Sequence, residues 1–223
     1  MKKKNTEVKT KRMVLQPMPE EEIVELIEHT KEEEMRKAYG EMLDGSRQDP
    51  ENRIWYAPWK MVLNESQKVI GDLCFKGPVT EHAVEIGYGV SPEYEGKGYM
   101  TEAVQAMVQW AFRQKDVIFV EAETDPENKA SQRVLEKCGF VQDGTGKEGP
   151  RFICESPVDD WSMTYMCFGM SIGMAIGSGH DQMVMGMSIG MGLGLCIGML
   201  MTESAKKERE KLRQKRKNAT EDK

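Results

Sequence analysis

Apolar residues recur in two rhythms along residues 12–160, either at every second residue or at every third to fourth residue. The first rhythm predicts strands and the second predicts helices. Short apolar runs bounded by turn residues predict strands over residues 12–17, 57–63, 69–75, 83–90 and 117–122. Helical spacing predicts helices after Pro19, over 101–114 and over 128–137, with a turn-rich break at 45–50.

Turn residues join the three middle strands, as Asn64-Glu-Ser and Lys76-Gly-Pro. Short turns of this kind predict an antiparallel meander. A helix, a strand, a second helix and a final strand follow along the sequence. This order predicts a mixed α/β (α+β) fold in which helices flank one sheet.

The pattern changes after Asp160. No residue is charged from Trp161 to Gly179 or from Gln182 to Thr202, and glycine recurs at every fourth position in both stretches. Met170–Gly177 and Met187–Gly194 are near repeats of each other. Each glycine weakens a helix in water by about 1 kcal/mol relative to alanine. In a membrane, by contrast, glycine lets two helices approach closely.

Three interpretations of residues 161–202 stay open. The first is a membrane hairpin of two helices joined at residues 178–182, since about twenty residues cross a bilayer. Against it, Trp161–Phe168 is also compatible with the last strand of the sheet, which would leave too few residues for the first crossing. The second is a glycine-zipper hairpin that self-associates and inserts only as an oligomer. The third is a methionine-rich packing element in water.

We therefore expect four parts: a disordered basic N-terminus (1–11), an α/β domain (12–165), a glycine-rich helical hairpin that is a candidate for membrane insertion (166–202) and a basic charged tail (203–223). Lysine and arginine favour the cytoplasmic side of a membrane. If the hairpin inserts, the tail and the α/β domain share that side. The tail also fits a solvated helix with surface ion pairs.

Composition excludes several classes of protein. The net charge of −6 gives no reason to expect that the body of the protein binds nucleic acid. The five cysteines are scattered and form no CxxC pair, which indicates free thiols in a reducing compartment. No metal site is predicted. No apolar segment follows Met1-Lys-Lys-Lys, so we expect no secretory signal and a cytoplasmic α/β domain.

One turn carries the clearest chemical signal. The strand over 83–90 is followed by Glu95-Gly-Lys-Gly98-Tyr-Met100, which leads into the helix over 101–114. Such a turn presents backbone N–H groups at the positive end of a helix, an arrangement that binds phosphate.

This turn and a second block identify a family resemblance. Glu95, Gly98 and Met100 occupy the slots of the pattern Q/R-x-x-G-x-G/A, although glutamate and methionine depart from its first and last positions. The second block runs from Asn128 through Ser131 to Gly139-Phe140. With both blocks, residues 12–165 resemble the GNAT superfamily of N-acetyltransferases, in its ribosomal-protein N-terminal acetyltransferase-like branch.

The resemblance implies a mixed, mostly antiparallel sheet flanked by helices, acetyl-CoA as co-substrate, no metal, and direct attack of a primary amine on the thioester. The cofactor-binding residues that it implies are Tyr88, Val90, Glu95, Gly96, Lys97, Gly98, Tyr99, Met100, Thr101, Asn128 and Ser131. Lys97 is expected to offset the charge of Glu95.

Glu85, on the strand before the turn, is the catalytic base that the resemblance implies, since an amine must lose a proton when it attacks. Its alternative role is that of a solvent-facing strand residue. The family's thiolate-protonating tyrosine is replaced by Leu135, so Tyr88, Ser131 or water must substitute. Asn128 also fits a simple helix cap, and Cys138 fits a packed thiol.

Two functional hypotheses follow from these expectations. The first is an N-acetyltransferase whose acceptor is a peptide or a small amine. A protein N-terminus, a polyamine and an amino sugar all fit, and the resemblance favours the first. The second is a non-catalytic CoA-binding module, tethered to a membrane or to other copies through residues 166–202. Leu135 and Glu95 are the residues that favour the second hypothesis.

Overall fold

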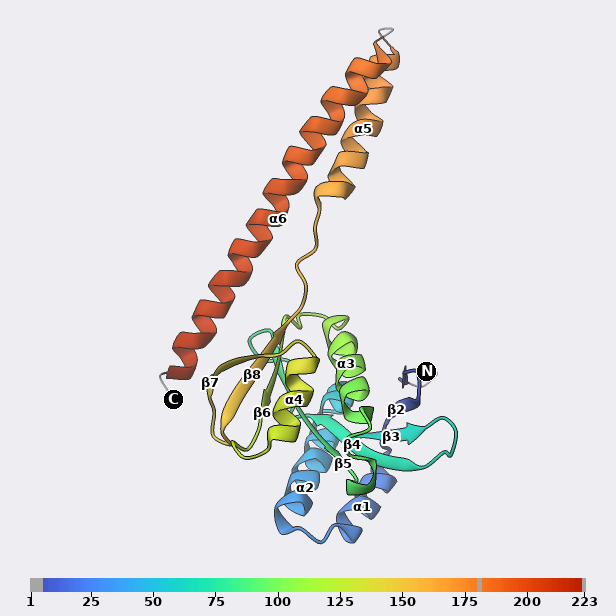
Figure 1. Ribbon diagram of the computed structural model, residues 1–223, viewed down its shortest axis with the longest axis vertical. Coiled ribbons are helices and arrows are strands. Elements are labelled where there is room, and N and C mark those ends of the chain that lie inside the picture. Colours follow the sequence, from blue (N-terminus) through green and yellow to red (C-terminus); the bar gives the residue numbers. More distant parts are fainter. Residues whose placement is uncertain (1–5, 180–181, 222–223) are drawn as a thin grey trace. The chain divides into compact units, whose positions relative to one another are not determined.

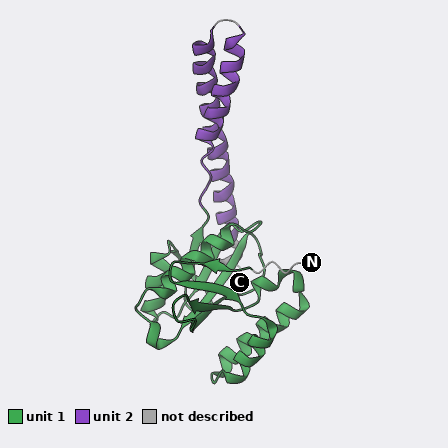
Figure 2. Ribbon diagram, turned by 90° about the vertical axis from the view of Figure 1, so that its right-hand side faces the viewer, with its two compact units in different colours: residues 1–156 green, residues 157–223 purple. Residues whose placement is uncertain are grey.

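The computed structural model describes residues 6–179 and 182–221. The chain divides into two compact units, one ending at Ser156 and the other beginning at Pro157. The first unit is a mixed α/β domain and the second is a pair of helices (Figures 1 and 2).

One sheet of eight strands, in the order β1-β2-β3-β4-β5-β6-β8-β7, frames the first unit. All neighbouring strands are antiparallel except β5 and β6, which are parallel. The predicted meander is therefore confirmed, as is the mixed, mostly antiparallel sheet. The strands are β1 (Val8–Lys9), β2 (Met13–Pro17), β3 (Trp59–Leu63), β4 (Val69–Phe75), β5 (Ala83–Val90), β6 (Phe119–Glu123), β7 (Val141–Thr145) and β8 (Pro150–Glu155).

The parallel strands β5 and β6 pair only at their beginnings, from Ala83↔Phe119 to Glu85↔Glu121. Beyond this point β5 continues against β4 as far as Val90, and β6 continues against β8. In the described part of the sheet, the edge of β5 beyond Glu85 that would face β6 therefore has no strand partner.

The helices of the first unit are α1 (Glu20–His29), α2 (Glu33–Gln48), α3 (Tyr99–Phe112) and α4 (Lys129–Lys137), with short 3-10 turns η1 (Pro50–Trp55) and η2 (Pro92–Tyr94). The stripe predicted for α3 is buried in the main core, because its apolar residues recur at helical spacing. Ala103, Val104, Met107, Val108 and Ala111 are all at most 2% exposed.

Helices α1 and α2 are joined to the outer strands by polar contacts. The Nζ of Lys60 on β3 donates to both carboxylate oxygens of Glu22 on α1, at 2.6 and 2.8 Å. The hydroxyl of Tyr39 on α2 donates to Oδ2 of Asp72 on β4 at 3.1 Å. Lys60 and Asp72 are direct neighbours across β3 and β4, so both helices cover the same face of the sheet.

The break predicted at residues 45–50 is wrong in its position, because α2 continues to Gln48. Gly45 lies inside the helix, where a Cβ atom would meet the ring of Tyr56. The glycine therefore makes room for an aromatic ring and does not form a turn. Asp49 then starts η1 by accepting a hydrogen bond from the Asn52 N–H.

Two expectations near the ends of the α/β domain also differ from the structure. Residues 8 and 9, expected in a disordered segment, form β1 on β2, because Val8 is buried in the main core; residues 1–5 lie outside the described part. Trp161–Phe168 is not a strand, since α5 begins at Ser162. The expected boundary near residue 165 thus falls inside a helix.

The second unit consists of α5 (Ser162–Ser178) and α6 (Met183–Glu221), which run side by side (Figure 2). Among the described helices, only α6 has the length and composition to cross a membrane, over Met183–Arg216. The charged tail expected after residue 202 continues α6 as helix. His180 and Asp181, within the predicted connection, lie outside the described residues.

Candidate active site

The turn after β5 enters α3 through two glycines in the left-handed conformation. Gly96 has a φ of 69° and Gly98 a φ of 76°, where a side chain costs roughly 1–2 kcal/mol. Gly98 directly precedes α3, and the first N–H groups of a helix have no partner within it. The turn therefore brings backbone donors to the positive end of the helix dipole, as phosphate binding requires.

Arg12, which sequence reasoning missed, holds this turn from the residue before β2. Its Nη1 donates to the carbonyl oxygen of Lys97 at 3.0 Å, and its Nε donates to Oε2 of Glu102 at 2.6 Å. Its guanidinium also lies over the Tyr99 ring, 4.2 Å from the ring centroid. Burial raises the pKa of Glu102, but the hydrogen bonds from Thr10 and Arg12 outweigh burial, so the pKa of Glu102 is lowered. Arg12 is 90 residues from Glu102 in sequence, so no local pattern indicated this contact.

A cleft of about 720 Å³ lies between the glycine turn, the end of β5 and α4. All the predicted cofactor-binding residues except Lys97 line this cleft. Residues that sequence reasoning missed line it as well: Gly89, Tyr94, Ala130, Arg133, Val134 and Lys137. Arg133 and Lys137 are exposed and one helical turn apart on α4, so they add two cations to a cleft that is suited to an anion.

The two charged side chains of the turn have different surroundings. Glu95 is exposed and lines the cleft. The Nζ of Lys97 donates to the Glu93 carbonyl oxygen at 2.7 Å and lies 5.2 Å from the centroid of the Tyr94 ring. The role of Lys97 in offsetting Glu95 stays a prediction, and the two α4 cations are the stronger candidates because they line the cleft.

The predicted residues of α4 are joined to β5 by hydrogen bonds. Asn128 caps α4, since its Oδ1 accepts a hydrogen bond from the Ser131 N–H at 2.9 Å. The Ser131 Oγ lies 2.9 Å from the phenol oxygen of Tyr88 on β5. Burial raises the pKa of Tyr88 to about 12, although its hydrogen bond with Ser131 acts in the opposite direction. Tyr88 is therefore protonated at neutral pH.

Leu135 and Cys138 are packing residues in this structure. Leu135 is fully buried in the main core, so it cannot assist a leaving group. The Sγ of Cys138 donates to the Thr101 carbonyl oxygen at 3.5 Å, and burial raises the pKa of Cys138 to about 12. A thiol of this kind is a poor nucleophile, since the thiolate is the reactive form.

Glu85 does not line the cleft described above. It is three residues from Tyr88 on β5, so the two side chains point to opposite faces of the sheet. Its Oε1 lies 2.6 Å from the Nζ of Lys76, and that ammonium also lies 2.9 Å from Oε1 of Glu148. Burial lowers the pKa of Lys76, but the hydrogen bonds to Glu85 and Glu148 outweigh burial, so the pKa of Lys76 is raised.

Asp72 lies on the same face as Glu85 and was not singled out from the sequence. It is the direct cross-strand neighbour of Gly89, which lines the cleft. Burial raises the pKa of Asp72, and the hydrogen bond from Tyr39 acts against this shift. The signal available in the sequence was a lone carboxylate within the apolar strand 69–75. The face thus holds two carboxylates, Glu85 paired with a lysine and Asp72 paired with a phenol.

No group of three or more His, Cys, Asp or Glu side chains that could hold a metal ion occurs within residues 6–179 and 182–221.

The family model of the acetyltransferase (GNAT) domain matches residues 12–141. The uncharacterized N-acetyltransferase YnaD of Bacillus subtilis is 34% identical over 88 residues, which are 40% of this chain and 52% of that protein. The [ribosomal protein uS5]-alanine N-acetyltransferase of Escherichia coli is 30% identical over 86 residues, 38% of this chain and 44% of that protein. The chain thus spans about half the length of these curated relatives.

Solved structures share the fold of the first unit. The ribosomal-protein-S5-alanine acetyltransferase of Vibrio fischeri superimposes with a TM-score of 0.54 at 20% identity, covering 70% of this chain and 98% of that one. Mycobacterium smegmatis RimJ, in complex with CoA-disulfide, gives a TM-score of 0.52 at 19% identity, covering 67% and 86%.

Proposed function

The chain belongs to the acetyltransferase (GNAT) family, and from this premise we propose that it transfers an acetyl group from acetyl-CoA to a primary amine. The observation that carries the proposal is the cleft formed by the turn with Gly96 and Gly98, the unpaired edge of β5 and the start of α4. The diphosphate of acetyl-CoA binds the N–H groups of the turn, with Arg133 and Lys137 as additional cations. The pantetheine arm runs along β5 at Tyr88–Val90.

The reaction forms a C–N bond and breaks the C–S bond of the thioester. The amine attacks the carbonyl carbon directly, loses one proton to a base and leaves CoA as a thiolate. Tyr88, with Ser131 behind it, donates a hydrogen bond to that thiolate. Because its pKa is raised to about 12, Tyr88 stabilises the thiolate as a donor and keeps its own proton, and the thiolate takes its proton from water.

Glu85 is the proposed base, acting on the amine from the face of β5 opposite to Tyr88. Its ion pair with Lys76 requires that the proton pass through water or that the pair open. Asp72 is the second candidate, since its raised pKa favours proton uptake. Glu85→Gln and Asp72→Asn separate the two in the pH profile of kcat/KM. The substitution that removes the base should abolish most of the rate and the increase of kcat/KM with pH, while CoA affinity is unchanged.

We propose a protein N-terminus as the acceptor. The support is that one of the relatives is named for the alanine of ribosomal protein uS5. The full chain, with acetyl-CoA and either an alanine-terminated peptide, a polyamine or an amino sugar, should release free CoA fastest with the peptide. Failure to bind CoA in a titration would overturn the proposed function as a whole.

A non-catalytic CoA-binding module is the second candidate. Two observations favour it: Leu135 is buried where the family's tyrosine would stand, and Glu85 is paired with Lys76. CoA binding without turnover, with every class of amine, would support this function over acetyl transfer.

We also propose that the protein is held at the cytoplasmic face of a membrane through residues 166–202. The support is the length and composition of α6, together with the basic run after it.

A further inference from the structure

The second unit exposes apolar side chains along α5 and on opposite sides of α6. On α5, Phe168, Ile172 and Ile176 are 60–64% exposed. On α6, Val184 is 75% and Leu193 is 61% exposed. These two residues are nine positions apart, which is roughly 180° around a helix. A partner docked on one face would leave half of this surface in water, whereas lipid surrounds a helix on all sides.

The two helices meet through glycine backbone. A Cβ atom at Gly173 would lie 2.1 Å from the Gly186 carbonyl oxygen, and one at Gly190 would lie 2.1 Å from the Gly169 carbonyl oxygen. A helical hairpin in water holds together by burying apolar side chains between its helices. In this pair the glycine backbones are in contact and the apolar side chains are exposed. Close backbone packing of this kind stabilises helix pairs in lipid.

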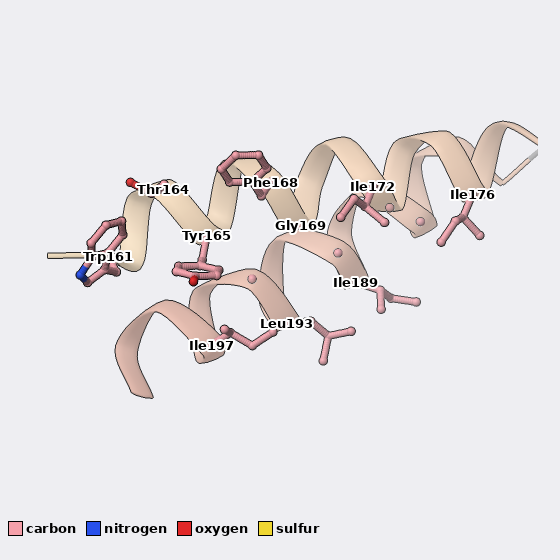
Figure 3. A pocket seen from close by; sticks show the side chains of 14 residues that line it. Trp161, Thr164, Tyr165, Phe168, Gly169, Ile172, Ile176, Ile189, Leu193 and Ile197 are labelled. Atoms are coloured by element: carbon pink, nitrogen blue, oxygen red, sulfur yellow. The ribbon is translucent and has the colours of Figure 1, made fainter. Parts of the chain in front are cut away.

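Two exposed serine hydroxyls of the hairpin are hydrogen-bonded within their own helices. The hydroxyl of Ser171 donates to the Cys167 carbonyl oxygen, and that of Ser188 donates to the Val184 carbonyl oxygen, both at 2.9 Å. A bilayer core offers no water, so internal pairing is the condition for burying hydroxyl groups there. An apolar groove of about 770 Å³ runs between the helices, lined by side chains of both (Figure 3).

Length and end residues match a bilayer. Residues 183–202 of α6 span about 30 Å, the ~30 Å of a hydrocarbon core. The 17 residues of α5 span roughly 25 Å, which is the lower limit of transmembrane helix lengths, so α5 crosses only as the partner of α6. The N–H of Trp161 donates to Oγ1 of Thr202 at 3.0 Å, which ties the start of one span to the end of the other. Aromatic residues and lysines favour the interface, and Trp161, Tyr165, Lys206 and Lys207 gather at this end.

We infer that α5 and residues 183–202 of α6 insert into a lipid bilayer as a two-helix hairpin, with Trp161 and Thr202 at the cytoplasmic face and Ser178 and Met183 at the opposite face. This inference rests on the proposed membrane attachment and is independent of acetyl transfer.

The test uses the full chain with its natural cysteines replaced, and one reporter cysteine at a time: Asp159→Cys, Ser178→Cys or Ala205→Cys. Bacterial spheroplasts that express each variant are treated with a membrane-impermeant maleimide before and after lysis. The hairpin predicts that Ser178→Cys is labelled in intact spheroplasts, and that Asp159→Cys and Ala205→Cys are labelled only after lysis. CoA binding by each variant confirms that the first unit is folded.

Three outcomes would overturn the inference. Labelling of Ser178→Cys only after lysis, in protein that stays with carbonate-washed membranes, indicates attachment without a double crossing. Labelling of Asp159→Cys and Ser178→Cys together from outside indicates that α6 crosses alone. Recovery of the protein as a soluble oligomer indicates that copies of the chain cover the apolar surface, and it removes the membrane attachment as well.

Discussion

The phenol oxygen of Tyr88 lies 2.9 Å from the Oγ of Ser131, so β5 is tied to α4 where both line the cleft. Tyr88→Phe removes this bond and the proposed donor for the leaving thiolate. A hydrogen bond to a charged group contributes about 1.5–3 kcal/mol, so we expect kcat to fall about 10–100-fold. Steady-state kinetics with the best acceptor would measure the loss.

Ser131→Ala is the matched control for Tyr88→Phe. It removes the contact between the two side chains but keeps the phenol, so a smaller loss of kcat is expected. CoA affinity, measured by titration, should stay within a few-fold in both variants. An equal kcat for Tyr88→Phe and the wild type would refute the role of the phenol.

The second prediction concerns Gly98, whose φ of 76° lies in the left-handed region. Gly98→Ala should destabilise the turn by roughly 1–2 kcal/mol and weaken CoA binding about tenfold, because the backbone donors shift. Calorimetric titration measures the affinity. Gly40→Ala is the control, since a Cβ there meets nothing within 4 Å. It should stabilise α2 by up to about 1 kcal/mol and leave CoA affinity unchanged.

Arg12 gives a third prediction. Arg12→Lys keeps one positive charge but loses the fork that reaches Lys97 and Glu102 together. We expect weaker CoA binding and faster deuterium uptake in the glycine turn, with Arg12→Ala affected more than Arg12→Lys. Wild-type uptake in both variants would show that the turn holds its conformation without this contact.

A pH dependence follows from Asp72. Burial raises its pKa in the folded state, so the folded protein holds this proton more tightly than the unfolded chain. The corresponding contribution to stability is present at low pH and is lost as the pH rises through the folded-state pKa. Asp72→Asn cannot ionise and still accepts a hydrogen bond from Tyr39. It should therefore gain more stability over the wild type at pH 7 than at pH 4, in chemical denaturation. A gain that is larger at pH 4 would contradict the raised pKa.

The hairpin offers a matched pair of glycines on α6. A Cβ at Gly190 would meet the backbone of α5, whereas a Cβ at Gly192 meets nothing within 4 Å. Gly190→Ala should therefore separate the helices and increase deuterium uptake in α5 and α6, while Gly192→Ala should leave uptake unchanged or lower it. Equal uptake in both variants would mean that the helices do not pack through this face.

The order of elements from β3 to α4 was predictable, because the apolar spacing of each element agrees with its burial in the domain. The stripe of α3 is an example, since the residues that define it in the sequence are the ones that the core buries. The strand β1, the division of the first helix into α1 and α2, and the hairpin of β7 and β8 in place of one final strand were not predicted. The prediction of a turn at Gly45 was wrong, because glycine is common both in turns and where another group packs closely against a helix. Only the position of Tyr56 distinguishes the two.

The cleft was predictable where its residues are close in sequence, as in the glycine turn and at the start of α4. Arg12 and the neighbourhood of Asp72 were not, because their partners come from distant elements. Glu85 shows the same limit. Its position on β5 was clear from the sequence, but its pairing with Lys76 depends on how β4 lies against β5.

The parting of β5 from β6 after Glu85 has a kinetic consequence. If acetyl-CoA reaches β5 along its unpaired edge and the amine comes from the face of Glu85 and Asp72, the two substrates use separate entrances. Both substrates can then be bound at the same time, and the reaction needs no covalent acyl-enzyme intermediate.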